Sequence, residues 1–254
     1  IEPGVHAGRE ATAALAVLVL GMFAGSLVKG VLGAGIPAVG LPIMVMVIDP
    51  PQAVSLFLVP VVLSNIWQIW EAGEIREAMR RYWGFTLALM ICVWIGAGAM
   101  VSADPKLIAL AVGILVICTT LFQIFSPDVS HVMGRMRGLH PIAGALIGLV
   151  AGVTGMLTPM IAYFAALRPP KDVFVTQLAI GAMLGMLPLF ARLAVEDHLT
   201  WDQVQGSVMA LIPAAAGLTV GFWIRKRISE AVFRRLVQIG LLAVSCGLIW
   251  RGLS

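Results

Sequence analysis

Two clusters of glycine and proline hold the residues best suited to bind a ligand through the backbone. The first, GVLGAGIP, covers residues 30–37, and the second, GVTGMLTP, covers residues 152–159. A shift of 122 residues aligns Gly30 with Gly152, Gly33 with Gly155, and Pro37 with Pro159. Proline suits the first turn of a helix, and Thr158 suits the cap position just before Pro159. We therefore expect each cluster to break one helix and to begin another.

The chemistry that such breaks favour is anion binding. The N-terminus of a helix presents unpaired N–H groups and about half a positive charge, and glycine lets a ligand approach the backbone closely. We therefore expect Gly33, Gly35, Gly155 and Thr158 to line a site for an oxyanion. The alternative is that the glycines only allow tight helix packing and that Thr158 only caps its helix. For a single glycine that explanation is the simpler one, whereas the repetition of the cluster favours a site.

Polar side chains on the apolar segments that follow each cluster add hydrogen-bond donors. Asn65, Gln68 and Gln177 can donate to the oxygens of an anion. A shift of 124 residues matches Gln68 with Arg192, which lies on the same helical stripe as Gln177. Polar residues inside membrane spans usually face protein or a cavity, so hydrogen bonds to neighbouring helices are the alternative role for each amide.

Two basic residues lie within apolar segments. Arg192 has a planar guanidinium fork that suits a sulfonate or a carboxylate, which makes it a candidate ligand. Its alternative is to extend to the outer surface from near the end of its segment. Lys29 stands just before the first cluster, and for it we favour extension to the inner surface over ligand binding.

The elements that carry these residues are predicted to be membrane helices. The chain has 254 residues, of which 60% are hydrophobic and 12% charged, and its mean hydropathy is +0.98. Soluble domains average about 25% charged residues, so this composition indicates an all-α integral membrane protein. The net charge of +4 comes largely from short loops, as membrane topology requires, and predicts no nucleic-acid partner. The sequence shows no metal-binding spacing, catalytic triad or phosphate loop, so we expect neither a cofactor nor an enzyme.

Apolar segments near the length of about 20 residues that crosses a bilayer follow one another along the chain. They cover residues 11–48, 53–70, 82–101, 107–125, 141–167, 173–193, 208–223 and 231–250. We divide the chain into a first transmembrane repeat at 11–104, an inverting span at 105–125, a polar linker at 126–140 and a second transmembrane repeat at 141–251. Each repeat begins with the segment that contains a glycine cluster.

The basic loops predict how the segments cross the membrane, because short cytoplasmic loops collect Lys and Arg. Most basic residues fall on one side only if segment 141–167 enters and leaves on that side. That segment would then form a re-entrant hairpin, whose arms of about 13 residues are too short to span. The alternative, one kinked helix of about 40 Å, would place Arg135 and Arg137 outside. With the hairpin, the halves become inverted-topology repeats whose broken helices meet at the midplane, a recurring plan of secondary transporters.

The whole pattern resembles the TauE/SafE family of sulfite exporters, which are small membrane proteins with two related halves. The resemblance rests on GLVAGVTGMLTP at 148–159, on the matching GSLVKGVLGAGIP at 25–37, and on PPQAVSL after the first break. Family members typically carry a G-x-G-G-G run where this chain has GAGIP at 33–37 and GMLTP at 155–159. The resemblance implies export of sulfite, an organosulfonate or a similar small anion across the bacterial inner membrane.

We therefore predict a multi-pass secondary transporter that exports sulfite or a related small organosulfur anion by alternating access, with the anion and the lipid bilayer as its partners. A channel or uniporter for another small solute and a non-transporting membrane assembly factor are the alternatives. The sequence does not indicate the oligomeric state. The predicted substrate-binding residues are Gly33, Gly35, Asn65, Gln68, Gly155, Thr158, Gln177 and Arg192.

Overall fold

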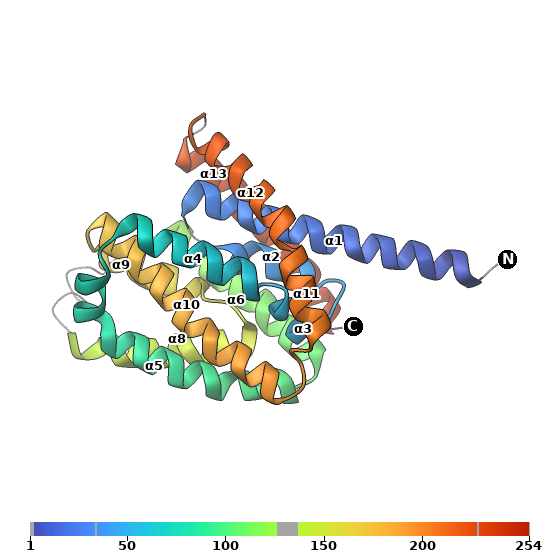
Figure 1. The fold of residues 1–254 in the computed structure, drawn as a ribbon, viewed down its shortest axis with the longest axis horizontal. Coiled ribbons are helices and arrows are strands. Elements are labelled where there is room, and N and C mark those ends of the chain that lie inside the picture. Colours follow the sequence, from blue (N-terminus) through green and yellow to red (C-terminus); the bar gives the residue numbers. More distant parts are fainter. Residues whose placement is uncertain (1–2, 34, 126–136, 228, 254) are drawn as a thin grey trace.

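The structure is a computed structural model that describes residues 3–33, 35–125, 137–227 and 229–253. This part of the chain is helical and contains no β-strand (Figure 1). Its elements are α1 (Pro3–Leu32), α2 (Ile36–Met44), α3 (Pro50–Ser55), α4 (Leu58–Ala72), α5 (Ile75–Ser102), α6 (Pro105–Phe125), η1 (Arg137–Leu139), α8 (His140–Thr154), α9 (Thr158–Leu167), α10 (Lys171–Val195), α11 (Trp201–Met209), α12 (Leu211–Arg225) and α13 (Glu230–Leu253). Residues 126–136 of the predicted linker, Arg135 among them, lie outside the described residues.

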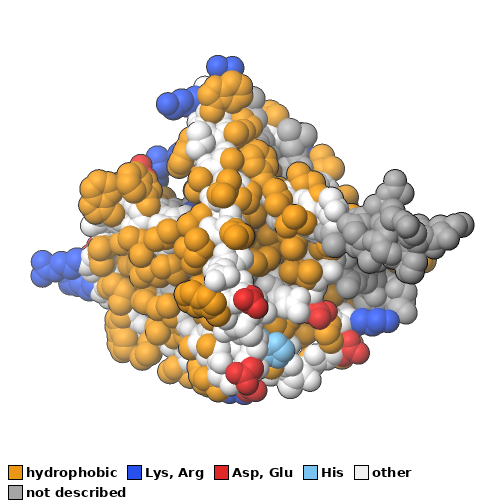
Figure 2. Space-filling view, turned by 45° about the vertical axis from the view of Figure 1, so that its right-hand side comes forward, with side chains coloured by type: hydrophobic (Ala, Val, Ile, Leu, Met, Phe, Trp, Pro, Cys, Tyr) orange, Lys and Arg blue, Asp and Glu red, His pale blue; other side chains and the backbone are white. Residues whose placement is uncertain are grey.

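Five stretches of helix in the described part are long and apolar enough to cross a membrane. They are Thr12–Leu32, Ile75–Ser102, Pro105–Phe122, Lys171–Val195 and Trp201–Arg225. Large apolar side chains such as Trp70, Phe125 and Ile212 are more than 70% exposed, and Figure 2 shows a broad apolar face with charged groups near its edges. Lipid solvates such a face, whereas water would not. The prediction of an all-α membrane protein is therefore confirmed.

The first glycine cluster breaks its segment as predicted. Helix α1 ends at Leu32, and the backbone turns through Gly33 and Gly35, which have φ values of 81° and 114°. An L side chain rarely adopts such angles, so glycine is strongly favoured at both positions. Helix α2 then begins with a proline in its first turn and returns along α1, so that Gly40 packs against the backbone of Gly21. The two helices therefore form a hairpin.

The second cluster also forms a hairpin. Helix α8 ends at Thr154 and is followed by Gly155, which has a φ of 71°, and α9 begins with a proline in its first turn. The ring of His140, the first residue of α8, forms a hydrogen bond of 2.6 Å with the Tyr163 hydroxyl of α9. A continuous helix would separate these residues by about 35 Å. The alternative of one long kinked helix is therefore wrong.

Two predicted segments are broken at places that the apolar pattern did not reveal. Segment 53–70 divides into α3 and α4, and segment 208–223 begins within α11 and continues as α12. Pro60 and Pro213 have no N–H to donate to the carbonyl four residues earlier, which weakens the helix there. The Ser207 hydroxyl of α11 compensates just before α4 by donating to the Leu56 carbonyl at 3.0 Å. The charged stretches 71–81 and 196–205 lie between the predicted apolar segments, but they are partly helical, since α5 begins at Ile75 and α11 at Trp201.

Two helix pairs approach each other closely through glycine. Helix α8 lies along α5, with Gly144, Gly148 and Gly152 against the α5 backbone. Helix α1 lies along α12, with Gly30 against Gly221. Small residues at intervals of four let the backbones of membrane helices come together in this way. Each hairpin is therefore packed on a helix from the other half of the chain.

Candidate functional site

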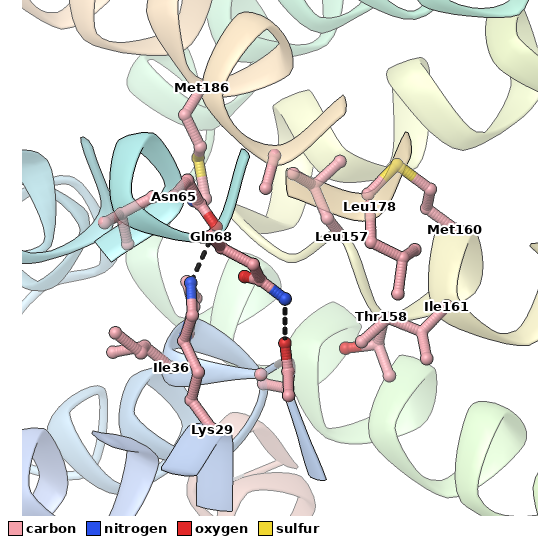
Figure 3. A pocket seen from close by; sticks show the side chains of 16 residues that line it. Lys29, Ile36, Asn65, Gln68, Leu157, Thr158, Met160, Ile161, Leu178 and Met186 are labelled. Carbon is pink, nitrogen blue, oxygen red and sulfur yellow. Dashed lines mark hydrogen bonds between the residues drawn. The ribbon is translucent and has the colours of Figure 1, made fainter. Parts of the chain in front are cut away.

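A cavity lies where the turns of the two hairpins meet, between α1, α2, α4, α9 and α10 (Figure 3). Its volume is ≈ 50 Å³. About 10–15 Å³ suffices for one water molecule, so several water-sized groups fit. The cavity has the size of a small ligand.

The N-termini of two helices open onto this cavity. Ile36, Pro37 and Ala38 from the first turn of α2 line it, together with Thr158 and Met160 from α9. Neither N-cap residue, Gly35 of α2 or Leu157 of α9, forms a side-chain capping hydrogen bond. The positive ends of both helix dipoles therefore face one small space, which favours an anion. This is the arrangement that the two glycine clusters predicted.

Thr158 contributes a free hydroxyl to the cavity. The prediction that it caps α9 is wrong, because Leu157 occupies the cap position and Thr158 is the first helical residue. The Thr158 side chain is 7% exposed, and its Oγ1 has no hydrogen-bond partner in the described part of the chain. Figure 3 shows this oxygen pointing toward the side of the cavity that carries Gln68. A buried hydroxyl without a partner is unfavourable unless a ligand or water occupies the space that it faces.

Two side chains of α4 meet the end of α1 at the cavity. Gln68 donates from Nε2 to the Gly33 carbonyl at 2.5 Å and so holds the last turn of α1 (Figure 3). Asn65 is 3% exposed and accepts a hydrogen bond from the Lys29 ammonium. The cavity thus brings together five of the predicted residues. They are Gly33, Gly35, Asn65, Gln68 and Thr158.

Lys29 lies in the cavity, and the expectation that it extends to the surface is wrong. Its side chain is 8% exposed, and Nζ lies 2.6 Å from Asn65 Oδ1 and 3.1 Å from Ser64 Oγ. A sequence signal for this position was present, because Lys29 stands four residues before Gly33 and so lies on the same face of α1 as the break. The site therefore contains a cation that sequence reasoning assigned elsewhere.

The opposite wall of the cavity is apolar. Leu157, Met160 and Ile161 come from the second hairpin, and Leu178 and Met186 come from α10. Figure 3 shows Leu157, Met160 and Leu178 facing the side from which Lys29, Asn65 and Gln68 project. The polar groups thus come almost entirely from the first half of the chain, and Thr158 is the polar side chain that the second half adds.

Three predicted residues lie outside the lining of this cavity. Gly155 packs into the core, where an added Cβ would lie 2.5 Å from Val54 Cγ2. Gln177 is fully buried and donates to Thr86 Oγ1 at 3.1 Å. Arg192 forms an ion pair of 2.6 Å with Glu196, one helical turn away. The contacts of Gly155 and Gln177 match the alternatives of helix packing and of hydrogen bonding to a neighbouring helix. Arg192 has an acidic partner, Glu196, which lies beyond the end of the predicted segment 173–193.

Comparison with known proteins identifies one family for this arrangement. A model of the family described as "Sulfite exporter TauE/SafE" matches residues 17–248. No curated protein and no solved structure shows a significant match to the chain. The family match includes both hairpins and every residue placed at the cavity.

Proposed function

The chain belongs to the sulfite exporter TauE/SafE family, and on this basis we propose that it exports sulfite or a related small organosulfur anion by alternating access. The observation that carries the proposal is the convergence of two helix N-termini and the Lys29 ammonium on one small cavity. Burying positive groups inside a membrane protein costs free energy unless a negative group balances them. Together these groups suit a small oxyanion. The family is one of transporters, so transport rather than catalysis is the expected activity.

In the proposed site the anion lies between the first turns of α2 and α9. Backbone N–H groups from the first turn of α2 and the Thr158 N–H of α9 donate to its oxygens, and the missing side chains of Gly33 and Gly35 let the ligand approach. Elsewhere in the first turn of α9, Pro159 has no N–H, and the Met160 N–H already donates to the Leu157 carbonyl at 3.0 Å. Lys29 supplies charge, and Thr158 Oγ1, which has no partner in the described residues, supplies one further hydrogen bond. Gln68 acts through Gly33, because its hydrogen bond orients the turn rather than contacting the ligand.

We propose that the two halves are inverted repeats that exchange conformations. The packing of the hairpins supports this, since Gly30 of α1 packs against Gly221 of α12 and Gly152 of α8 packs against Ala97 of α5. A shift of 122 residues takes Gly30 to Gly152, and a shift of 124 takes Ala97 to Gly221. The two shifts therefore carry the contact between Gly30 and Gly221 onto the contact between Gly152 and Ala97, as a two-fold relation between the halves requires. Such a pair of halves can open one site to either side of the membrane.

The proposed orientation in the bacterial inner membrane places the α4–α5 connection and the start of α10 in the cytoplasm, where basic loops collect. Exposed sites for labelling are Glu74 and Lys171 on that side and Lys106 on the other. In a cysteine-free background, Lys106→Cys should react with an impermeant maleimide from outside intact cells, whereas Glu74→Cys and Lys171→Cys should react only after the cells are opened. Labelling of Lys171→Cys from outside would contradict the inverted arrangement.

Flux into proteoliposomes tests the function itself. Radiolabelled sulfite should enter vesicles that contain the protein at a rate that saturates with concentration, and unlabelled sulfite inside should accelerate its entry by exchange. Protein-free vesicles from the same lipid correct for passive leakage. A rate that rises linearly with concentration would indicate a channel, and a rate equal to that of protein-free vesicles would indicate a protein without transport activity.

A further inference from the structure

The Lys29 ammonium is held only by neutral groups. Asn65 Oδ1 and Ser64 Oγ accept its hydrogen bonds, and the Ser64 hydroxyl in turn donates to the Val61 carbonyl at 3.2 Å. Among the side chains that the structure describes, no Asp or Glu forms an ion pair with Lys29. The remaining lining of the cavity is apolar, consists of backbone, or belongs to the neutral side chains of Gln68 and Thr158. Among the described residues, the cavity thus contains a positive group and no fixed negative group to balance it.

The described residues of the elements packed around Lys29 bring no other titratable side chain to it. Helix α2 has none, and Glu71 of α4 is exposed at the far end of its helix. Helix α12 packs along α1 and has Arg225 at its exposed end. The described basic residue of α13, Arg235, is exposed, and Arg192 of α10 is already paired with Glu196. In the described part of the chain, the group that gains or loses a proton at the cavity is therefore Lys29.

Burying an ammonium ion without a counter-ion is strongly unfavourable, and the group then tends to be neutral. An anion in the cavity supplies the missing counter-ion, so it favours the protonated lysine. Because linkage is reciprocal, a proton on Lys29 strengthens anion binding by the same factor. The proton and the anion therefore bind together and leave together.

We propose that Lys29 is the proton-binding residue of the transporter and that each monovalent anion crosses the membrane with one proton. This inference rests on the proposed function, whose site it deepens. On the side of entry, the Nζ lone pair accepts a proton from water and becomes an ammonium ion as the anion binds. After the site opens to the other side, the anion leaves and the ammonium returns its proton to water there. No other bond changes, and the occupied site carries no net charge from lysine and anion together.

The test uses the purified full chain and methanesulfonate, an anion that stays fully ionised at every pH used. A proton taken up on binding must therefore be taken up by the protein. Titration calorimetry in Bis-Tris and in Tris, two amine buffers that differ in ionisation enthalpy, counts the protons bound with each anion. We expect net proton uptake, and a Kd that rises with pH by up to about tenfold per pH unit, as linkage to a single proton requires.

Two substitutions assign the proton to Lys29. Lys29→Arg keeps a permanent charge, so it should bind methanesulfonate without proton uptake and with a Kd that does not depend on pH. Lys29→Met should bind it weakly at every pH. If the variant with the bulkier arginine does not fold, as judged by thermal melting, the assignment is tested by the number of protons that the parent and Lys29→Met take up with each anion.

The outcomes separate the two proposals. If the parent binds methanesulfonate without proton uptake and with a Kd independent of pH, Lys29 does not couple the proton and the inference is wrong, while the anion site stands. Proton uptake that persists in Lys29→Met would also overturn it. If the parent binds neither methanesulfonate nor sulfite, the proposed function fails and this inference fails with it.

Discussion

The two hairpins have closely similar backbones and very different side chains. In both, a helix ends at a glycine with positive φ and a second helix begins with a proline in its first turn. The first hairpin presents Lys29 and an open glycine turn to the cavity, whereas the turn of the second is packed into the core at Gly155. The comparison teaches that the repeat supplies the two helix N-termini, while the charge and every polar side chain except Thr158 come from the first half.

The hairpins are also secured differently. The first is held by close backbone packing, with Gly21 and Gly25 of α1 against α2. The second is tied at its open end by the hydrogen bond between His140 and Tyr163 and by the Tyr82 and Phe164 rings, whose centroids lie 4.9 Å apart. Specific side-chain contacts of this kind can be removed one at a time, whereas glycine packing tolerates no substitution.

The largest expected effect compares valine at the two turns. Gly155→Val would force a side chain into contact with Val54 and Met100 at a positive φ, and we expect it to destabilise the protein by several kcal/mol, about 3 or more. At Gly33 the nearest atom to an added Cβ is Gln68 Nε2 at 3.9 Å, so Gly33→Val meets only backbone strain of about 1–2 kcal/mol. Gly33→Val should therefore fold but lose transport, because its side chain lies where the anion approaches. Thermal melting and flux measure both effects, and equal loss of fold in the two variants would contradict the comparison.

The next prediction compares how much Lys29 of the first half and Arg192 of the second half contribute to sulfite binding. Lys29→Met should weaken sulfite binding about 10- to 100-fold, the value of a charge-assisted hydrogen bond of about 1.5–3 kcal/mol. Arg192→Gln is the matched control, because its ion pair with Glu196 lies outside the cavity. Calorimetric Kd values of both variants give the answer. If Arg192→Gln weakens binding as much as Lys29→Met does, the charge is not supplied by the first half alone.

A smaller effect is expected at the hydroxyl that the second hairpin contributes. Thr158→Val keeps the shape of the side chain and removes a hydrogen bond of about 1 kcal/mol, so sulfite affinity should fall about fivefold. Thr176→Val is a closely matched control, because Thr176 Oγ1 is also buried without a partner in the described residues but lies outside the cavity lining. An equal effect of both substitutions on Kd would show that Thr158 does not contact the anion.

The smallest effect concerns the tie at the open end of the second hairpin. Tyr163→Phe removes the hydrogen bond to His140 but keeps the ring that stacks on Phe85 at a centroid distance of 5.4 Å. We expect a loss of about 1 kcal/mol of stability, seen as a lower melting temperature. Sulfite affinity should stay unchanged, and a changed Kd in this variant would show that the open end of the hairpin communicates with the site.

The sequence predicted those features of the site that depend on backbone preference. Glycine and proline define the two breaks locally, and Thr158, Asn65 and Gln68 follow from polarity within apolar segments. Lys29 was misassigned because its position depends on Ser64 and Asn65, which meet it only through tertiary packing across about 35 residues of chain. A long side chain near a helix end has the same local pattern whether it turns inward or outward.

Arg192 and Gln177 illustrate the same limit in the second half. The apolar pattern ended the segment of Arg192 at residue 193, whereas α10 continues to Val195 and the chain beyond it brings Glu196 within reach of the guanidinium. Charged residues are good helix formers, so hydropathy underestimates the length of a membrane helix. Gln177 bonds to Thr86, 91 residues away, and no feature of spacing identifies that partner.

The most direct test of the central claim is to locate the anion in a crystal of the protein grown with selenite, the heavier analogue of sulfite. Selenium gives an anomalous signal that protein atoms do not. The account predicts one peak in the cavity, within hydrogen-bond distance of Lys29 Nζ, Thr158 Oγ1 and the first-turn N–H groups of α2 and α9. A peak beside Arg192, or density in the cavity that is unchanged by selenite, would contradict it.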